Sequence, residues 1–410
     1  MTAPPLLLDI TRLVVHAFSK KHATGIERVC AAYLAHFADR SLAVLQYRGL
    51  FRVLRKADGE ALMSVLQRAD SVPRRTLLRA LLAGLSRSSP NPPFRGLRYV
   101  NIGHTDFDLP GHLEWIERNQ VQPLYFIHDL IPLTHPHFTT PHKAKRHRGR
   151  VENALRYGVG MIVNSEATKD ELMRYAQLHR LPLPPLRVAR LASSQNRRCT
   201  QGSADPRPKF LCIGTIEPRK NHILLLRIWC KLIGRMGDDA PDLCIIGKWG
   251  VLAQPVRDFL AANPSLAQHV SLRHDCSDEE RAKMMTTARG LLFPSLAEGF
   301  GLPVMEALQN GLPVIASDLP CLREIGEGGP EFCDPSDEDA WLRAIEDFAN
   351  CGPRFRRQIS KLGHFRAPTW QSHFAGLDEW IACLHQANHD EGLASKSTIA
   401  DGLSLSLATG

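Results

Sequence analysis

The feature that most constrains this chain is a regular alternation of short apolar runs with segments of helical periodicity. The alternation continues almost from one end to the other, and it favours parallel sheets covered by helices. Each half of the chain therefore predicts a doubly wound α/β unit. The predicted strands are Leu6–Ile10, Leu42–Tyr47, Tyr99–Ile102, Leu124–Ile127, Met161–Asn164 and Leu186–Ala189 in the first half, and Phe210–Gly214, Leu243–Gly247, Val270–Leu272, Leu291–Pro294 and Pro313–Ala316 in the second.

Two predicted helices carry clear N-terminal signals. Apolar residues recur at spacings of three and four from Ile26 to Phe37, and Thr24 stands where an N-cap is expected. Ser277 is followed three residues later by Glu280, which is the pattern of a capping box.

Length and composition predict two domains. A chain of 410 residues exceeds one ordinary domain. The stretch 192–206 has the composition of a linker, so we expect an N-terminal domain of residues 1–200 and a C-terminal domain of residues 207–368. Residues 388–410 are rich in Gly, Ser, Ala and Asp and predict a disordered tail. Two open α/β sheets that face each other would enclose a cleft at their carboxyl strand edges.

The composition is that of a soluble globular protein, with 44% hydrophobic and 23% charged residues. No uncharged apolar stretch reaches the roughly 18–20 residues that a bilayer span needs. The first residues lack the basic region of a signal peptide, so we expect a cytoplasmic protein. The ten cysteines include no Cys-x-x-Cys pair, which favours reduced thiols over disulfides or a zinc site.

The net charge of +9 is distributed unevenly. Residues 1–200 carry 30 Lys and Arg against 15 Asp and Glu, and the remainder carries 21 against 27. A basic first half suggests an anionic partner, such as nucleic acid, an anionic membrane surface or a phosphate-bearing substrate. We do not expect nucleic-acid binding, because the chain has no zinc-finger spacing and no aromatic residues within its basic runs.

Two segments carry much of the basic surplus. Residues 74–87 predict an amphipathic helix, with Leu77, Leu78, Leu81, Leu82 and Leu85 on one face and arginines beside it. Two interpretations stay open: an interfacial helix on the inner face of the cytoplasmic membrane, or a surface helix packed on its own domain. Residues 143–150 are either a solvated helix face or a patch that attracts an anionic acceptor.

The segment Phe293–Ala307 is the most informative for function. A predicted strand ends at Pro294, a loop with two glycines follows, and Pro303 stands at a first helical position. Such a loop lets the backbone approach a ligand, and the free N–H groups of the helix start favour an anion such as a diphosphate. Glu298 and Glu306 could bind hydroxyl groups at two levels of an elongated ligand. The alternative is a solvated helix start.

A second segment, Phe210–His222, places Arg219 and Lys220 directly after a predicted strand. Arginine binds phosphate in a bidentate manner, and lysine acts as a compact point charge. Two cations at the carboxyl end of a strand suit a diphosphate leaving group. The alternative is a surface turn with both side chains in water.

Taken together, the segment Gly214–Asn221 and the later segment Glu298–Glu306 resemble the family 4 (group 1) retaining nucleotide-sugar glycosyltransferases. Seven residues separate the two glutamates, as in the Glu-x7-Glu motif of that family. The likeness extends to Asp9–Arg12 with Thr24–Val29, to Phe126–Pro132 and to Asn164–Leu172. It implies the GT-B fold, in which two Rossmann-like domains face a central cleft.

The resemblance also implies roles in binding the sugar donor. Arg219 and Lys220 would hold the diphosphate and neutralise the leaving group, and Glu306 would bind the ribose hydroxyls. Glu298 would contact the transferred sugar together with the backbone of three neighbours. These neighbours are Phe300, Gly301 and Leu302.

In the N-terminal domain, His128 would lie near the anomeric carbon, and Gly25 would let the first loop approach the phosphates. That domain would bind the acceptor. A C-terminal helix within residues 369–387 would cross back onto it. A metal site at His128, His135, His137 and His142 is an alternative, but proline breaks disfavour it and the family is generally metal-independent.

The implied function is transfer of a hexose from a nucleoside diphosphate sugar, with retention of configuration and without a cofactor. The chain most resembles bacterial mannosyltransferases of surface-polysaccharide assembly (lipopolysaccharide, capsule or exopolysaccharide), which favours GDP-mannose as donor and a glycan or polyprenyl-diphosphate-linked sugar as acceptor. One alternative is a non-catalytic nucleotide-sugar-binding subunit of a membrane-associated assembly complex. Another is a glycoside hydrolase with paired carboxylates, which would have no use for the diphosphate-binding cations.

Overall fold

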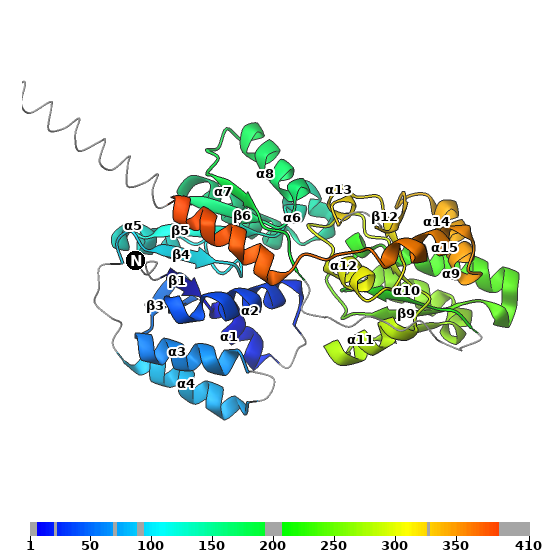
Figure 1. Ribbon diagram of the computed structural model, residues 1–410, viewed down its shortest axis with the longest axis horizontal. Helices are drawn as coiled ribbons and strands as arrows, with labels where there is room; N and C mark the ends of the chain where they lie inside the picture. The colour runs from blue at the N-terminus through cyan, green and yellow to red at the C-terminus, as the bar shows by residue number, and fades with distance from the viewer. Residues whose placement is uncertain are drawn as a thin grey trace, which may run out of the picture.

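The computed structural model describes residues 6–19, 23–68, 72–87, 94–192, 207–325 and 329–384. These residues form two lobes, each built around one sheet (Figure 1). The predicted α/β class with two doubly wound units is confirmed. The predicted tail 388–410 lies outside the described residues, as do residues 193–206 of the predicted linker.

The first lobe contains a seven-stranded sheet in the order β3-β2-β1-β4-β5-β6-β7. All neighbouring strands are parallel except β2 and β3, which form an antiparallel hairpin at the edge. We did not predict β3, because its exposed first residue, Leu50, and Arg52 obscure the apolar run. The strands are β1 (Leu6–Asp9), β2 (Ser41–Tyr47), β3 (Leu50–Val53), β4 (Arg98–Asn101), β5 (Gln122–Ile127), β6 (Gly160–Val163) and β7 (Leu186–Val188).

Eight helices of the first lobe lie within the described residues. The predicted cap at Thr24 is present, and it forms a complete capping box with Glu27 at the start of α2. The helices are α1 (Thr11–Phe18), α2 (Gly25–Phe37), α3 (Lys56–Leu66), α4 (Arg74–Ser86), α5 (Pro110–Asn119), α6 (Ile131–Thr134), α7 (Pro141–Tyr157) and α8 (Glu166–Leu178).

The second lobe contains a six-stranded, wholly parallel sheet in the order β10-β9-β8-β11-β12-β13. In this order the chain reverses direction across the sheet between β8 and β11, which is where such sheets bind ligands. The short edge strand β13 was not predicted. The strands are β8 (Lys209–Ile213), β9 (Asp242–Ile246), β10 (Val270–Arg273), β11 (Gly290–Phe293), β12 (Val314–Ser317) and β13 (Glu331–Cys333).

Helices cover both faces of the second sheet (Figure 1). The predicted capping box of Ser277 and Glu280 opens α11. The helices of this lobe are α9 (His222–Met236), α10 (Gln254–Ala262), α11 (Asp278–Thr287), α12 (Leu302–Gln309), α13 (Pro320–Arg323), α14 (Glu338–Ala349) and α15 (Pro353–Leu362).

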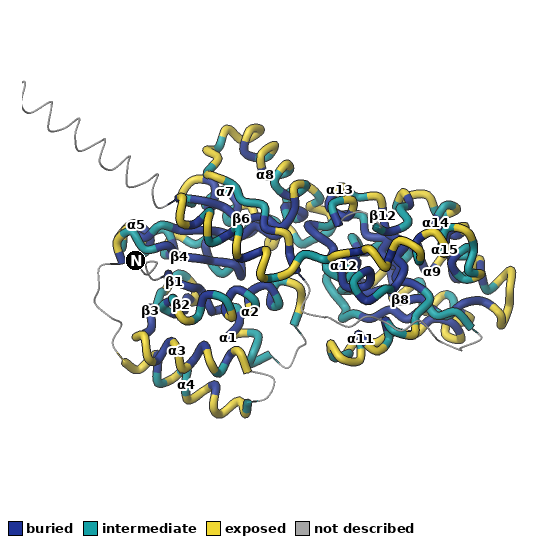
Figure 2. The backbone as a smooth tube through the Cα atoms, in the orientation of Figure 1, coloured by how far each residue is buried: buried dark blue, intermediate teal, exposed yellow. Residues whose placement is uncertain are grey.

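The strands β1, β4, β6, β11 and β12 are buried along their whole length, and β5 and β8 are buried except at their first residue (Figure 2). Helices cover both faces of a doubly wound sheet, so its strands need apolar side chains on both sides. This burial explains why the strands appear in the sequence as nearly continuous apolar runs rather than as an alternating pattern.

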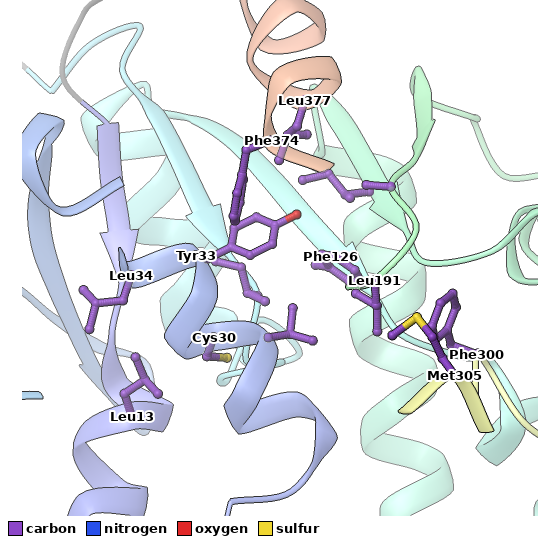
Figure 3. Packing of buried hydrophobic residues seen from close by; sticks show 14 of the residues in the cluster. Leu13, Cys30, Tyr33, Leu34, Phe126, Leu191, Phe300, Met305, Phe374 and Leu377 are labelled. Carbon is purple, nitrogen blue, oxygen red and sulfur yellow. The ribbon is translucent and has the colours of Figure 1, made fainter. Parts of the chain in front are cut away.

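A last helix of residues 370–384 follows the second lobe but packs on the first (Figure 1). The ring of Phe374 lies 5.0 Å from that of Tyr33 in α2, and Leu377 is fully buried beside them (Figure 3). His373 Nε2 lies 3.0 Å from the Tyr33 hydroxyl, and His36 Nε2 lies 2.9 Å from Asp378 Oδ2. Asp378 also forms an ion pair with Arg40. Aromatic packing and polar contacts thus attach this helix to α2.

The helix predicted over residues 74–87 is present as α4, and its five leucines differ in how far they are covered. Leu77 is buried and Leu81 is half-buried, whereas Leu78, Leu82 and Leu85 are 46%, 55% and 41% exposed. The spacing of residues 78, 82 and 85 defines a second apolar stripe that runs beside the buried one. This second stripe faces solvent.

Among the described residues, no helix is both long and apolar enough to span a bilayer. The nine cysteines in this part of the chain are all free thiols.

Replacing Leu377 by Ala should destabilise the attachment of the last helix. Leu377 is fully buried, and truncating a buried leucine to alanine costs about 2–5 kcal/mol. We expect a lower urea midpoint for Leu377→Ala by tryptophan fluorescence. The control is Glu379→Ala on the exposed side of the same helix, which should change stability by less than about 0.5 kcal/mol. Equal midpoints for the two variants would contradict this packing.

Candidate active site

A cavity of about 450 Å³ lies between the lobes, where strands of both sheets end. Both lobes line it, and every site residue predicted from the sequence lies on its wall. The predicted residues are Gly25, His128, Arg219, Lys220, Glu298, Phe300, Gly301, Leu302 and Glu306.

Arg219, Lys220 and Glu298 form one compact ionic cluster. Arg219 and Lys220 lie in a single 3₁₀ turn, Pro218–Lys220, that follows β8, and Glu298 lies in the loop after the neighbouring strand β11. Lys220 Nζ is 2.5 Å and Arg219 Nη1 is 2.9 Å from the same Glu298 oxygen. Arg219 Nε also contacts Glu217 at 2.6 Å. The strands β8 and β11 are adjacent, so the two loops meet at one edge of the sheet.

The charges in this cluster stabilise one another. Burial alone would raise the pKa of Glu298, but the Arg219 and Lys220 charges outweigh it and lower that pKa to about 2. Burial disfavours the charged form of Arg219, yet Glu298 and Glu217 raise its pKa. Burial lowers the pKa of Lys220, and Glu298 opposes that shift. Glu298 therefore stays ionised throughout the physiological range of pH.

Helix α12 begins at the cavity wall. Its N-cap, Gly301, has φ of +100°, and a Cβ there would lie 2.4 Å from a Leu322 methyl group, so the position requires glycine. Gly301, Leu302 and Pro303 all line the cavity, which places the positive end of this helix against it. Glu306, one turn further on, is 1% exposed and forms an ion pair with Arg28 of the first lobe.

His128 enters the cavity from the loop that follows β5. Its Nε2 lies 2.9 Å from the Ile102 carbonyl, so this nitrogen carries the proton and donates it. Burial lowers the pKa of His128 to about 4, and the hydrogen bond to Ile102 offsets only part of that effect. His128 is thus a neutral imidazole at pH 7, and its Nδ1 is an acceptor.

The two lobes meet at the loop that carries Glu298. The carbonyl oxygen of Gly299 accepts hydrogen bonds from Ser165 Oγ at 2.8 Å and Thr168 Oγ1 at 3.2 Å. Close by, the Glu324 carboxylate accepts from the backbone N–H groups of Glu166 and Ala167 at the start of α8. The second lobe therefore supplies the capping carboxylate of a helix in the first lobe.

Sequence reasoning missed Arg28, although it lies within the segment Thr24–Val29 that carries the family resemblance. The basic run 143–150 lies on α7, and two of its three arginines form ion pairs with acids of the same lobe. Arg146 pairs with Asp106 and Asp108, and Arg150 pairs with Asp108.

Within the described ranges no group of three His, Cys, Asp or Glu side chains could hold a metal ion.

Known proteins resemble this chain in sequence and in fold. Residues 194–364, which include the ionic cluster and α12, match the family model described as glycosyl transferases group 1. The chain is 39% identical over 154 residues to the serotype-specific mannosyltransferase WbdA of Escherichia coli, covering 36% of this chain and 18% of that one. It is 28% identical over 158 residues to the O-antigen chain mannosyltransferase RfbU of Salmonella typhimurium, covering 37% and 42%.

The chain thus spans less than half the length of either of these relatives. A solved structure with the same fold is that of Anabaena HepE in complex with UDP. It has a TM-score of 0.62 and 14% sequence identity, and the match covers 93% of this chain and 100% of that one. At this identity the likeness establishes the fold, which is GT-B as predicted.

Replacing Gly299 by Ala should weaken the contact between the lobes. A Cβ at this position would lie 2.2 Å from the His128 carbonyl oxygen and 3.0 Å from the Asp129 Cβ, so one lobe has to shift. We expect a loss of about 1–3 kcal/mol, seen as a lower thermal transition, together with a larger radius of gyration in solution scattering. Gly363→Ala is the control, because no atom lies within 4 Å of its added Cβ. An unchanged radius and transition for Gly299→Ala would refute the tight contact.

Proposed function

We propose that this chain, whose residues 194–364 belong to the group 1 glycosyl transferases, transfers a hexose from a nucleoside diphosphate sugar to a sugar acceptor with retention of configuration. The proposal rests on one observation. The cavity between the lobes is lined by Arg219, Lys220, Glu298 and Glu306 together. Five cationic side chains and three carboxylates line this cavity, which leaves a surplus of positive charge. Such a surplus suits a ligand that carries a diphosphate.

In this proposal Arg219 and Lys220 bind the diphosphate and stabilise the charge that develops on it as the sugar leaves. Each cation uses only part of its donor capacity on Glu298: arginine has five N–H donors and lysine three. Arg219 also contacts Glu217 through Nε and the Ala297 carbonyl through Nη1. Its Nη2 and the remaining donors of Lys220 would therefore bind the phosphate oxygens. Gly25 lines the cavity from the start of α2, where a small residue admits the phosphates. No metal cofactor is part of the proposal, since the protein's own cations supply the positive charge.

The two glutamates then bind hydroxyl groups at the two ends of the donor. Glu306 binds the ribose hydroxyls. Glu298 binds hydroxyls of the transferred sugar. The backbone at Phe300, Gly301 and Leu302, at the N-terminus of α12, contacts the same sugar. Ionised carboxylates suit this purpose, because they accept hydrogen bonds that are stronger than those between neutral groups.

We propose that His128 orients the sugar rather than donating a proton. Its low pKa keeps the ring neutral, and its Nε2–H is already committed to Ile102. Retention then follows a front-face route. The acceptor hydroxyl attacks the anomeric carbon on the side from which the diphosphate departs. As the new C–O bond forms and the C–O bond to phosphate breaks, an oxygen of the leaving phosphate takes the proton of the hydroxyl.

The names of the sequence relatives support mannose as the sugar and surface polysaccharide as the product. We therefore propose GDP-mannose as the donor and a glycan or polyprenyl-diphosphate-linked sugar as the acceptor, used at the cytoplasmic side of the membrane. Thermal-shift measurements with GDP and with UDP test which base the site prefers. A ligand at a hundred times its Kd stabilises a protein by about 2.7 kcal/mol, so the preferred nucleotide should raise the unfolding transition clearly.

Lys220→Ala and Glu298→Ala should each lower kcat/KM for transfer from GDP-mannose by about 10²–10³-fold, because each removes a charged contact to the reacting part of the donor. The assay follows labelled mannose onto a polyprenyl-diphosphate-linked oligosaccharide. Arg118→Ala, on the exposed end of α5, is the control and should keep full activity. Full activity in both site variants would refute the site. Release of free mannose without transfer would favour a hydrolase, and nucleotide binding without turnover would favour a non-catalytic subunit.

We further propose that α4 rests on an anionic membrane surface, where a lipid-linked acceptor would be found. Leu78, Leu82 and Leu85 form an exposed stripe, and Arg74, Arg75 and Arg79 are exposed on the same helix. Leu50 of the adjacent hairpin is 75% exposed, and Arg52 of β3 donates to the Leu85 carbonyl at 2.9 Å. Apolar side chains between arginines match the boundary between acyl chains and anionic headgroups.

Replacing Leu78 and Leu82 together by Glu should abolish pelleting with phosphatidylglycerol vesicles, because the change adds negative charge and removes the apolar contact. Wild type should bind these vesicles and should not bind pure phosphatidylcholine. Leu183→Glu, at a leucine that is 44% exposed elsewhere on the first lobe, is the control and should bind like wild type. If wild type does not pellet, or if the double variant pellets equally, α4 has no such role.

A further inference from the structure

We propose that Arg28 of the first lobe is a positioning residue for Glu306, so that the ribose end of the donor site is complete only when the two lobes meet. The inference rests on the proposed function, in which Glu306 takes the ribose hydroxyls. It means that the lobe expected to bind the acceptor also contributes, through Glu306, to recognition of the nucleotide.

The first observation is the burial of Glu306 and the origin of its nearest counter-charge. Glu306 is 1% exposed and belongs to α12 of the second lobe. Its Oε1 forms an ion pair with the Arg28 guanidinium, which belongs to α2 of the first lobe and whose side chain is 18% exposed. A carboxylate buried to this extent needs a close cation, because an unpaired charge is costly to remove from water.

The second observation is that, among the residues described in the second lobe, this carboxylate has only a distant cation. Arg281 of α11 has its Nη2 3.9 Å from Glu306 Oε2, at the outer limit of an ion pair. The same nitrogen lies 2.9 Å from Asp278. The arginine of its own lobe is therefore shared with another acid. The close charge that orients Glu306 comes from across the cleft.

The local structure of α2 places Arg28 next to Glu306. The capping box of Thr24 and Glu27 determines where the helix starts. A Cβ on Gly25 would lie 3.3 Å from a Leu302 methyl group, so the first turns of α2 and α12 are already in close contact. Arg28 follows Gly25 by three residues, and it therefore points along the same contact toward Glu306. All four residues Gly25, Arg28, Leu302 and Glu306 line the cavity.

The consequence is a coupling between closure of the lobes and recognition of ribose. When the lobes part, Glu306 loses the cation that orients it, and the nucleotide loses a well-placed acceptor. A donor that engages Glu306 therefore favours the closed arrangement in which the acceptor lobe is in contact with it.

The test compares GDP with 2′,3′-dideoxy-GDP by calorimetry, or UDP with its dideoxy form if wild type prefers UDP. Wild type should bind GDP about tenfold more tightly than 2′,3′-dideoxy-GDP, which corresponds to a difference of about 1.4 kcal/mol in binding free energy. Arg28→Ala and Glu306→Gln should each bring the ratio of the two Kd values close to one. The double variant should lower that ratio no further than Glu306→Gln alone. Arg28→Lys should restore part of it. Arg118→Ala, distant from the cleft, should keep the full ratio.

The ratio separates positioning from a purely structural role, because general damage would weaken both nucleotides equally. Thermal unfolding of each variant shows whether it is folded. If Arg28→Ala retains the full ratio, or if its effect adds to that of Glu306→Gln, the proposal for Arg28 is wrong while the proposed function stands. If wild type binds neither GDP nor UDP, the proposed function fails, and the Arg28 proposal fails with it.

Discussion

The ion pair between Lys220 and Glu298 is the contact on which the second lobe's side of the cleft depends. It joins the loop after β8 to the loop after β11, and it is reinforced by two hydrogen bonds. The Leu296 N–H donates to the Arg219 carbonyl, and the Arg219 side chain donates to the Ala297 carbonyl. Removing one partner of a buried ion pair costs about 3–5 kcal/mol, because the other charge is left without compensation. The same charges that would bind a diphosphate therefore also fix the relative position of these two loops.

The loop that carries Glu298 is in contact with both lobes. On one side it is held by Arg219 and Lys220, and on the other its Gly299 carbonyl is held by Ser165 and Thr168. A shift of either lobe is thus transmitted to the backbone that flanks Glu298. This arrangement explains how a few polar contacts can link the geometry of donor binding to the relative placement of the lobes.

The features that sequence patterns predicted well are those with a local physical cause. Buried parallel strands need apolar runs, and parallel strands end at a common edge, so the meeting of Arg219, Lys220 and Glu298 followed from their places after two strands. The pairing of Arg28 with Glu306 could not be derived in this way. It depends on how two separately folded lobes face each other, and no spacing within either segment encodes that.

Two further features could not be predicted for a similar reason. The strand β3 contains Arg52 and an exposed Leu50, so its pattern does not indicate a strand of the sheet. On α4, the leucines at 77 and 81 and those at 78, 82 and 85 form two adjacent stripes, and periodicity alone cannot say that only the first is covered. Which stripe faces the protein is decided by packing against α3, with Gly84 buried at the contact with Leu54.

The return of residues 370–384 to the first lobe means that the chain passes between the lobes twice, once between Ala192 and Arg207 and once after Leu362. These two connections join the second lobe to the first at both of its ends. They also define how such proteins can be recombined. A second lobe taken from a related chain has to be joined at both passages. The helix of residues 370–384 has to come from the recipient, because it must fit Tyr33, His36 and Arg40 of the first lobe.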